Sequence, residues 1–284
     1  MPTTDLTAML SPAASTRPTP AVFDSLDYAQ AVLIQGREVP WENPLELASL
    51  LDQAQSLMHS NAIVFDLGGF VAHRLKTDLR LRQRLAERSR PGYAFKAMAG
   101  DDALRDDAAE LASIIAKTAG APLIIRLPSP RVWLGVAHQA AGHDDAAVLT
   151  AEMVENYAAY YANWLHGLET VPFAALLIDD RWQGPGDAPE SGDPHRWTPV
   201  FNVADHNRWL LLLHDHDGGL GLLTADGTAE ESARAQVVAD AYWASPDAQP
   251  DRLADGESFR FSHVPVDAVP ETVLAQLAKL DGSV

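Results

Sequence analysis

The sequence predicts an α/β fold built on a mostly parallel sheet, with an antiparallel hairpin in the C-terminal half. Three observations support this prediction. Apolar runs of strand length alternate with helical segments over the first two thirds of the chain. The stretch 121–181 has the pattern of a β-α-β unit whose two strands end in polar residues. Further on, Asp217-Gly218 lies between two apolar runs, which is typical of a hairpin turn.

The expected strands are short apolar runs bounded by Gly, Pro or polar residues. We place them at 31–35, 62–67, 93–98, 123–127 and 173–178, and then at 199–203, 208–213, 220–224 and 258–264. Gly68-Gly69 is expected to end the second of these strands. The last three runs before residue 225 follow one another with no room for helices, and this is where the parallel pattern gives way to the hairpin.

The expected helices carry apolar residues at helical spacing. The first begins at Pro44, with Asn43 as its N-cap. The others span 76–88, 101–118, 150–168, 228–243 and 270–280. The segment 183–194 is rich in Gly, Pro, Asp and Ser, which predicts a loop of the kind that often builds a site.

The chain has 284 residues, of which 47% are hydrophobic, so it can bury a sizeable core. We expect one domain over residues 21–284. Residues 1–20 are rich in Pro, Thr, Ser and Ala, a composition that predicts a disordered tail. These residues have no basic segment followed by an apolar one, so they do not read as a secretory signal.

The net charge of −18 is spread along the chain, which argues against nucleic acid or an anionic membrane surface as a partner. No apolar run approaches the roughly 20 residues that a membrane-spanning helix needs. The absence of cysteine excludes disulfides, thiolate-bound zinc, iron–sulfur clusters and thiol catalysis. The expectation is a cytoplasmic protein with a small-molecule substrate, and a homo-oligomer is compatible with it.

Two adjacent carboxylates, Asp179 and Asp180, end the strand 173–178. Neighbouring strand residues point to opposite faces, so at most one of them faces the interior of a barrel or sheet. A carboxylate there can bind an amine or a metal, or act as a base. The alternative is a simple loop start in which Asp180 pairs with Arg181.

Arg126 lies in an otherwise apolar strand and therefore needs an anionic partner. That partner is either an anionic group of the substrate or a structural carboxylate such as Asp66, which lies near the end of its own strand. His263 ends the late strand FRFSH and is a further candidate for substrate binding. His138 and His143 flank a loop and are weaker candidates for lining a cleft.

The pair His214-x-His216 would place two imidazoles on one face of an extended strand. That arrangement suits a divalent metal such as Zn²⁺, which accepts imidazole nitrogen. It also suits a role in proton transfer. The alternative is a solvated hairpin tip, where polar residues and Gly collect.

The stretch 121–181 resembles the (β/α)₈ superfamily of uroporphyrinogen decarboxylase and cobalamin-independent methionine synthase. That superfamily has a strand ending in an LPGP-like turn, a long helix, and a strand ending in IDEP. The matching residues here are Leu127-Pro128-Ser129-Pro130 and Ile178-Asp179-Asp180-Arg181. Its methyltransferase branch has a later HxC zinc pair, for which the nearest match is His214-Asp215-His216, with His in place of Cys.

The resemblance implies a (β/α)₈ barrel-like fold, a site at the carboxyl ends of the strands, and contact of Asp179 with the substrate. The first functional hypothesis is therefore an enzyme for a small polar or anionic substrate, acting by methyl or alkyl transfer or by lyase chemistry. Asp179, His214 and His216 would be catalytic, and Arg126, Asp66, Asp180 and His263 would bind substrate. One alternative is a hydrolase that depends on a metal at His214 and His216. The other is a non-catalytic, degenerate barrel that binds a partner protein.

Overall fold

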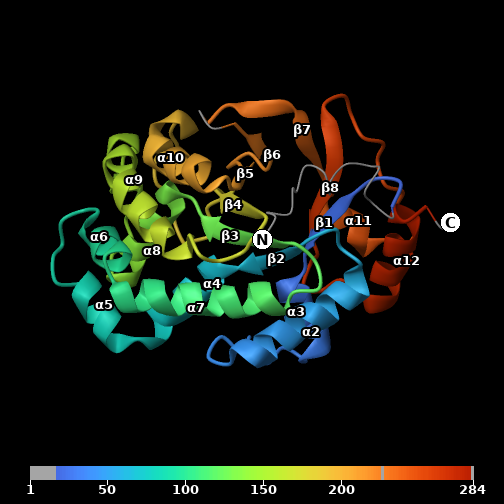
Figure 1. Ribbon diagram of the computed structural model, residues 1–284, viewed down its shortest axis with the longest axis horizontal. Helices are drawn as coiled ribbons and strands as arrows, with labels where there is room; N and C mark the ends of the chain where they lie inside the picture. The colour runs from blue at the N-terminus through green and yellow to red at the C-terminus, as the bar shows by residue number, and fades with distance from the viewer. Residues whose placement is uncertain (1–16, 225–226, 283–284) are drawn as a thin grey trace.

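The computed structural model describes residues 17–224 and 227–282, and within them eight strands close into a barrel (Figure 1). The strands follow chain order around the barrel: β1 (Ala21–Asp24), β2 (Ile63–Asp66), β3 (Leu123–Pro128), β4 (Ala175–Asp179), β5 (Leu210–His214), β6 (Leu220–Leu223), β7 (Ala229–Val237) and β8 (Glu257–His263). Only β6 runs antiparallel to both of its neighbours, and the other pairings are parallel. The predicted α/β barrel-like fold with an antiparallel C-terminal part is confirmed.

Helices connect most of the strands and cover the outside of the barrel. They are α2 (Leu26–Leu33), α3 (Pro44–Met58), α4 (Leu67–Thr77), α5 (Leu79–Leu85), α6 (Tyr93–Ala99), α7 (Asp102–Thr118), α8 (Pro130–Ala140), α9 (Ala151–Leu165), α10 (Thr198–Asn207), α11 (Asp240–Ala244) and α12 (Pro270–Leu280), with 3₁₀ turns η1 (Ala146–Val148), η2 (His166–Leu168) and η3 (Pro194–Trp197). The Asn43 side chain caps α3, as predicted, by accepting from Glu46 N. The β5–β6–β7 part is joined without helices.

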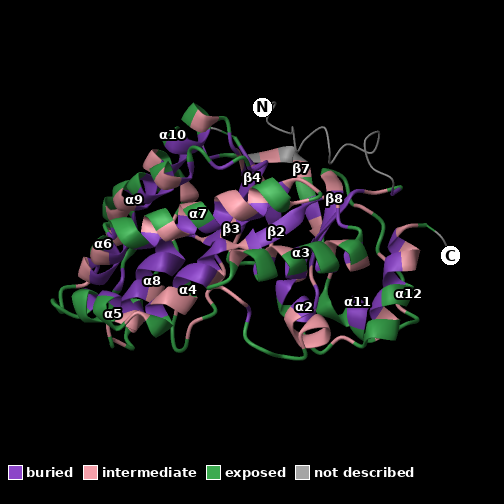
Figure 2. Ribbon diagram, turned by 60° about the horizontal axis from the view of Figure 1, so that its bottom comes forward, coloured by how far each residue is buried: buried purple, intermediate pink, exposed green. Residues whose placement is uncertain are grey.

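The core has an inner and an outer layer. The inner layer fills the barrel with apolar side chains: Val22, Ala62, Val64, Ile124, Ala174, Ala175, Leu177, Leu212, Leu220, Ala235, Phe259 and Phe261. The outer layer lies between the strands and the covering helices. Figure 2 shows the buried strands at the centre, with exposed residues on the outward faces of the helices. The interior of the barrel is therefore a packed core rather than a channel.

Two expected strands are helices in the structure. The segment 93–98 is α6, which buries Ala94, Phe95 and Met98 at helical spacing. The segment 199–203 lies in α10, where Val200, Phe201 and Ala204 are buried, again at helical spacing. A short apolar run fits either period, and packing against neighbouring helices decided both cases.

The first strand also differs from the prediction. Residues 31–33 are the last turn of α2 and 34–35 follow it, whereas β1 lies earlier, at Ala21–Asp24. The predicted helix 228–243 is instead β7 followed by the short α11. β7 pairs with β6 on one side and β8 on the other and so closes the barrel, which outweighs the helical pattern of its sequence.

The basic helix expected at 76–88 is split at Asp78, whose carboxylate accepts from Arg80 N and Leu81 N and begins α5. Gly68 and Gly69 do not simply end a strand, because they form the first turn of α4. Most of the predicted tail, residues 1–16, lies outside the described residues. Arg17, within the same segment, is buried and donates to the Met58 carbonyl oxygen at 2.8 Å. No helix in the described ranges combines the length and apolar character needed to cross a membrane.

Candidate functional site

Six ionisable side chains lie at the carboxyl ends of the parallel strands, directly above the apolar interior of the barrel. Residues two positions apart on a strand share a face, so each residue that follows an interior apolar side chain by two positions faces the interior as well. Six ionisable residues meet this condition: Asp24, Asp66, Arg126, Asp179, His214 and His263. The residues two positions before them all belong to the inner core, in the same order Val22, Val64, Ile124, Leu177, Leu212 and Phe261. We call the six residues the carboxyl-end ring.

The barrel register arranges the ring as three cross-strand pairs. Asp24 is the register partner of His263, Asp66 that of Arg126, and Asp179 that of His214. Five of the six residues were predicted from the sequence as site residues, and the structure brings these five together. Asp24 was missed because the first strand was placed too late.

Arg126 is the centre of an ion-pair network. Its Nη1 donates to Asp24 Oδ2, and its Nη2 donates to Asp66 Oδ2 at 2.7 Å. Burial disfavours the charge of Arg126, but the two carboxylates outweigh burial and raise its pKa. Burial likewise opposes the charge of Asp24, but Arg126 and His263 overcome it and lower the pKa of Asp24. The predicted partner Asp66 is therefore present, together with a second carboxylate.

Asp179 is held by Arg181, the second residue after it in the chain. Arg181 Nε donates to Asp179 Oδ1 at 2.9 Å and its Nη2 donates to Oδ2 at 2.8 Å, a bidentate pair. Burial raises the pKa of Asp179, but the hydrogen bonds and charge of Arg181 outweigh this and lower it. Asp179 is therefore ionised at neutral pH. Sequence analysis did not assign this role to Arg181.

The two ring histidines have opposite electrostatic surroundings. His214 is only 2% exposed, packs edge-on against Phe261, and its Nδ1 has no hydrogen-bond partner among the described residues. Burial, followed by the charge of Arg181, lowers the pKa of His214 to about 4. The Nδ1 of His263 lies 3.5 Å from Asp24 Oδ2, and its Nε2 lies 3.6 Å from Asp27 Oδ2. Hydrogen bonding to Asp24 raises the pKa of His263 despite its burial.

A pocket of about 250 Å³ lies beside the ring. It is lined by Asp66, Gly68, Gly69, Ala72, Arg126, Pro128, Val132, Val136, Asp179, Arg181, Gln183 and Gly184. One wall is the first turn of α4, where a Cβ atom on Gly68 would lie 2.5 Å from Pro128 Cδ. Glycine is therefore required for α4 to approach β3 this closely. The pocket combines ionic groups with an apolar wall, as small-molecule sites do, and its size suits a small ligand.

Asp180 and His216, both predicted as site residues, lie outside the ring. Asp180 Oδ1 accepts from Ser129 Oγ and, at 3.0 Å, from Arg131 Nε, so its partner is Arg131 and not Arg181 as the loop alternative supposed. β5 ends at His214, so strand alternation does not extend to His216. His216 is exposed instead, with its Nδ1 3.8 Å from Asp180 Oδ2. A metal held jointly by His214 and His216 stays a prediction.

A different group of side chains could hold a metal ion. His138, His143 and Asp145, at the end of α8, each offer one ligand atom, and these atoms lie within 4.8 Å of one another. His138 Nε2 lies 2.9 Å from Asp145 Oδ1. Within residues 17–224 and 227–282, no other group of three or more His, Asp or Glu side chains brings its ligand atoms this close together.

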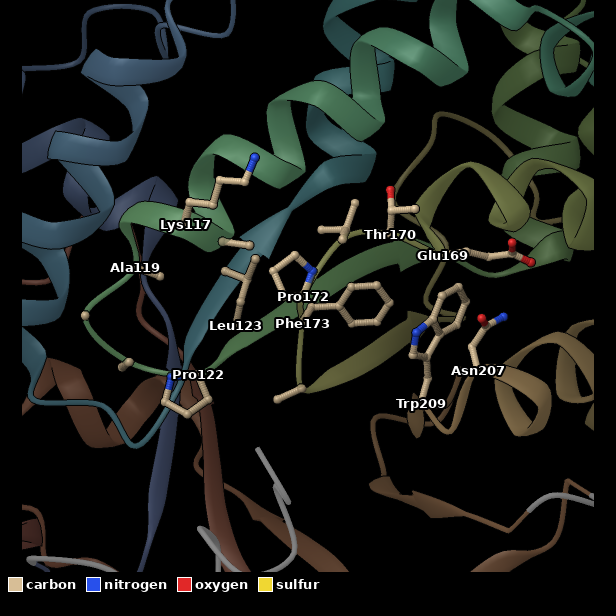
Figure 3. A pocket seen from close by; sticks show the side chains of 15 residues that line it. Lys117, Ala119, Pro122, Leu123, Glu169, Thr170, Pro172, Phe173, Asn207 and Trp209 are labelled. Carbon is tan, nitrogen blue, oxygen red and sulfur yellow. The ribbon is translucent and has the colours of Figure 1, made fainter. Parts of the chain in front are cut away.

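A larger pocket, about 680 Å³, lies at the opposite end of the barrel, where β3, β4 and β5 begin (Figure 3). Phe173 and Trp209 pack against each other there, and Lys117 and Glu169 lie on opposite sides of the pocket. Enzymes with parallel α/β barrels use the carboxyl ends of the strands. The charged groups of this pocket are also far fewer than those of the ring. We therefore assign the candidate site to the ring despite the smaller pocket.

Comparison with models of known protein families gives no match, and comparison with curated proteins finds no significant sequence similarity. The assignment therefore rests on the geometry alone. One signal in the sequence would have located the missing carboxylate: Val22-Phe23-Asp24 repeats Val64-Phe65-Asp66, and both segments form strands that end at the ring.

Proposed function

We propose that this protein is an enzyme that acts on a small polar or anionic substrate at the carboxyl-end ring. The reaction class is lyase or group-transfer chemistry that depends on proton transfer. The observation that carries the proposal is the convergence of six ionisable side chains at the carboxyl ends of the strands beside a pocket, where the two histidines have surroundings that move their pKa values in opposite directions. Environments that separate the pKa values of two titratable groups are how enzymes assign the roles of acid and base.

The surroundings of each histidine give it a role. His214 is neutral at pH 7, and its buried Nδ1 has no hydrogen-bond partner in the part of the chain that the structure describes, so it is suited to exchange a proton with the substrate. His263, next to Asp24, is suited to be the proton donor. In a lyase step, His214 would accept a proton from the substrate while the bond to the leaving group breaks, and His263 would protonate that group.

The remaining ring residues position the substrate and balance its charge. Arg126 is shared between Asp24 and Asp66, so its charge is largely compensated within the protein. Arg181 is paired with Asp179, but its side chain is 27% exposed and lines the pocket, so it could also meet an anionic group of the substrate. Asp179, ionised and in the same pocket, would accept a hydrogen bond from a substrate hydroxyl or amine. This matches the substrate contact that the superfamily resemblance implies for Asp179.

The test begins with a thermal-shift screen of small carboxylates, folates and tetrapyrroles, followed by an assay of the compounds that stabilise the protein. We expect His214→Gln and His263→Gln each to lower kcat by about 10²- to 10⁴-fold, the usual contribution of a general acid or base. The exposed His206, outside the ring, supplies the control His206→Gln, which should leave kcat unchanged. Full activity in both ring variants would refute the proposal. An absence of any stabilising compound would favour the non-catalytic alternative.

A metal-dependent hydrolase is the second candidate, because the buried Nδ1 of His214, which has no partner among residues 17–224 and 227–282, is also suited to bind Zn²⁺. Metal that copurifies with the wild-type protein and is lost in the His214→Ala variant would favour it.

A further inference from the structure

The end of α8 folds back on itself through a tight turn that brings two histidines together. Gly142 has a φ of 94°, in the left-handed region, and His143 N donates to the His138 carbonyl oxygen at 3.3 Å. This is the usual way in which a glycine ends a helix. As a result, the imidazole of His143 stacks on the imidazole of His138, with centroids 4.6 Å apart and an angle of 20° between the imidazole planes.

The same turn brings a carboxylate to the two imidazoles. Asp145 Oδ1 lies 2.9 Å from His138 Nε2, and the ligand atoms of all three residues lie within 4.8 Å of one another. The side chain of His138 is 5% exposed, whereas that of Asp145 is 63% exposed. One edge of the group is therefore fixed in the protein and the other is open to solvent, which gives an ion a path of entry.

The donor set identifies the class of ion. Two imidazole nitrogens and one carboxylate oxygen are ligands that Zn²⁺ and related transition metals prefer, whereas Mg²⁺ and Ca²⁺ prefer oxygen alone. We propose that His138, His143 and Asp145 bind one divalent transition metal of the zinc class, at a site separate from the carboxyl-end ring. Three protein ligands leave a coordination position for water.

The site is connected to the pocket of the ring through the loop that follows β4. Gln139, next to His138, donates from Nε2 to the Pro185 carbonyl oxygen at 2.8 Å. Trp182 Nε1 donates to the Gly186 carbonyl oxygen, which closes the loop on itself. Gln183 and Gly184 of this loop line the pocket. A metal that fixes the end of α8 would therefore also restrain one wall of the pocket.

The proposal is tested by titrating metal-free protein with Zn²⁺, and with Co²⁺ as a probe that absorbs in the visible range when bound. We expect one equivalent to bind. His143 is half-buried and Asp145 is exposed, so His143→Ala and Asp145→Ala should fold normally, which circular dichroism checks. Each should raise Kd by more than roughly 10-fold, a loss that even the partner of a metal ligand can cause.

Two further variants locate the metal. His206→Ala should bind Zn²⁺ like the wild type, because His206 lies outside the group, and His216→Ala tests the predicted His214-x-His216 pair instead. Hydrogen exchange at 182–186 should slow when Zn²⁺ is added to the wild type and not when it is added to His143→Ala. The proposal is overturned if the metal-free wild type binds no Zn²⁺, if His143→Ala binds it equally well, or if only His216→Ala abolishes binding.

Discussion

In six strands of the barrel, β1 to β5 and β8, the last residue that faces the interior is ionisable, whereas in β6 and β7 it is not. β6 is reversed, so its first residue, Leu220, is the register partner of His214, and an apolar group stands where a parallel strand would place its last residue. β7 contributes Ala235 to the inner core. Strand direction therefore explains the gap at β6, because its carboxyl end lies at the other edge of the barrel, whereas β7 is parallel to β8 and differs only in its apolar sequence.

The two regions also differ in how their strands are followed. Asp66 caps α4 by accepting from Gly69 N, and Ser129 caps α8 by accepting from Val132 N, so helices begin immediately at the ring. β5 and β6 are joined by a turn, in which Asp215 Oδ1 accepts from Gly219 N at 2.7 Å. The carboxyl ends of β2 and β3 therefore carry charged side chains and lead directly into helices, whereas the β5–β6 connection is a turn without a helix.

The sharpest way to break this comparison is to remove the central cation of the ring. Arg126→Met leaves Asp24, which is 1% exposed, and Asp66 without their counter-charge. We expect a loss of about 3–5 kcal/mol in the free energy of unfolding at pH 7, measured with urea. Arg234→Met, on the exposed side of β7, is the matched control and should change stability by less than about 0.5 kcal/mol. Equal stability of the two variants would show that the network is not needed.

The second prediction concerns pH. The pKa of His214 is about 4 in the folded protein and about 6.5 in an unfolded chain, so between these values the unfolded state binds the proton more strongly. The contribution of His214 to stability is complete above pH 6.5 and is lost as the pH falls toward 4. It amounts to about 3 kcal/mol.

His214→Leu should therefore flatten the dependence of unfolding free energy on pH between 6.5 and 4. His263→Gln is the comparison, because the raised pKa of His263 places its effect at higher pH, where its contribution is lost as the pH rises. Urea unfolding at a series of pH values checks both variants. An unchanged acid slope in His214→Leu would contradict the prediction.

The smallest expected effect compares two glycines. A methyl group on Gly68 would meet the ring of Pro128, which cannot move aside, so Gly68→Ala should destabilise the protein by about 1–3 kcal/mol. The nearest atom to a Cβ on Gly221 of β6 lies 3.7 Å away, so Gly221→Ala should be neutral or slightly stabilising. Thermal denaturation of both variants makes the comparison, and a Gly68→Ala variant as stable as the wild type would remove the argument for close packing.

Several site residues could be predicted because strand ends carry a local signal. Asp66, Asp179 and His214 each follow an apolar run directly, and His263 ends a strand. A charged Arg126 inside an apolar run requires a partner. The errors were of a different kind. The expectation that His214 and His216 share a strand face was wrong, because β5 ends at His214, whereas a role for His216 in the site stays a prediction. The residues of α6 and β7 suit either a helix or a strand, and neighbouring elements decided between the two.

By itself, the sequence determined that the chain is an α/β protein, because the alternation of apolar runs and amphipathic segments is a local property that survives in any arrangement of the elements. Only the tertiary structure decided that Asp24 lies opposite His263 and that Arg131 forms an ion pair with Asp180. It also decided that the side chains of His138, His143 and Asp145 lie close together. The reason is physical. Register, closure of the barrel and the return of a chain after a glycine turn are set by contacts between segments, and no single segment carries that information.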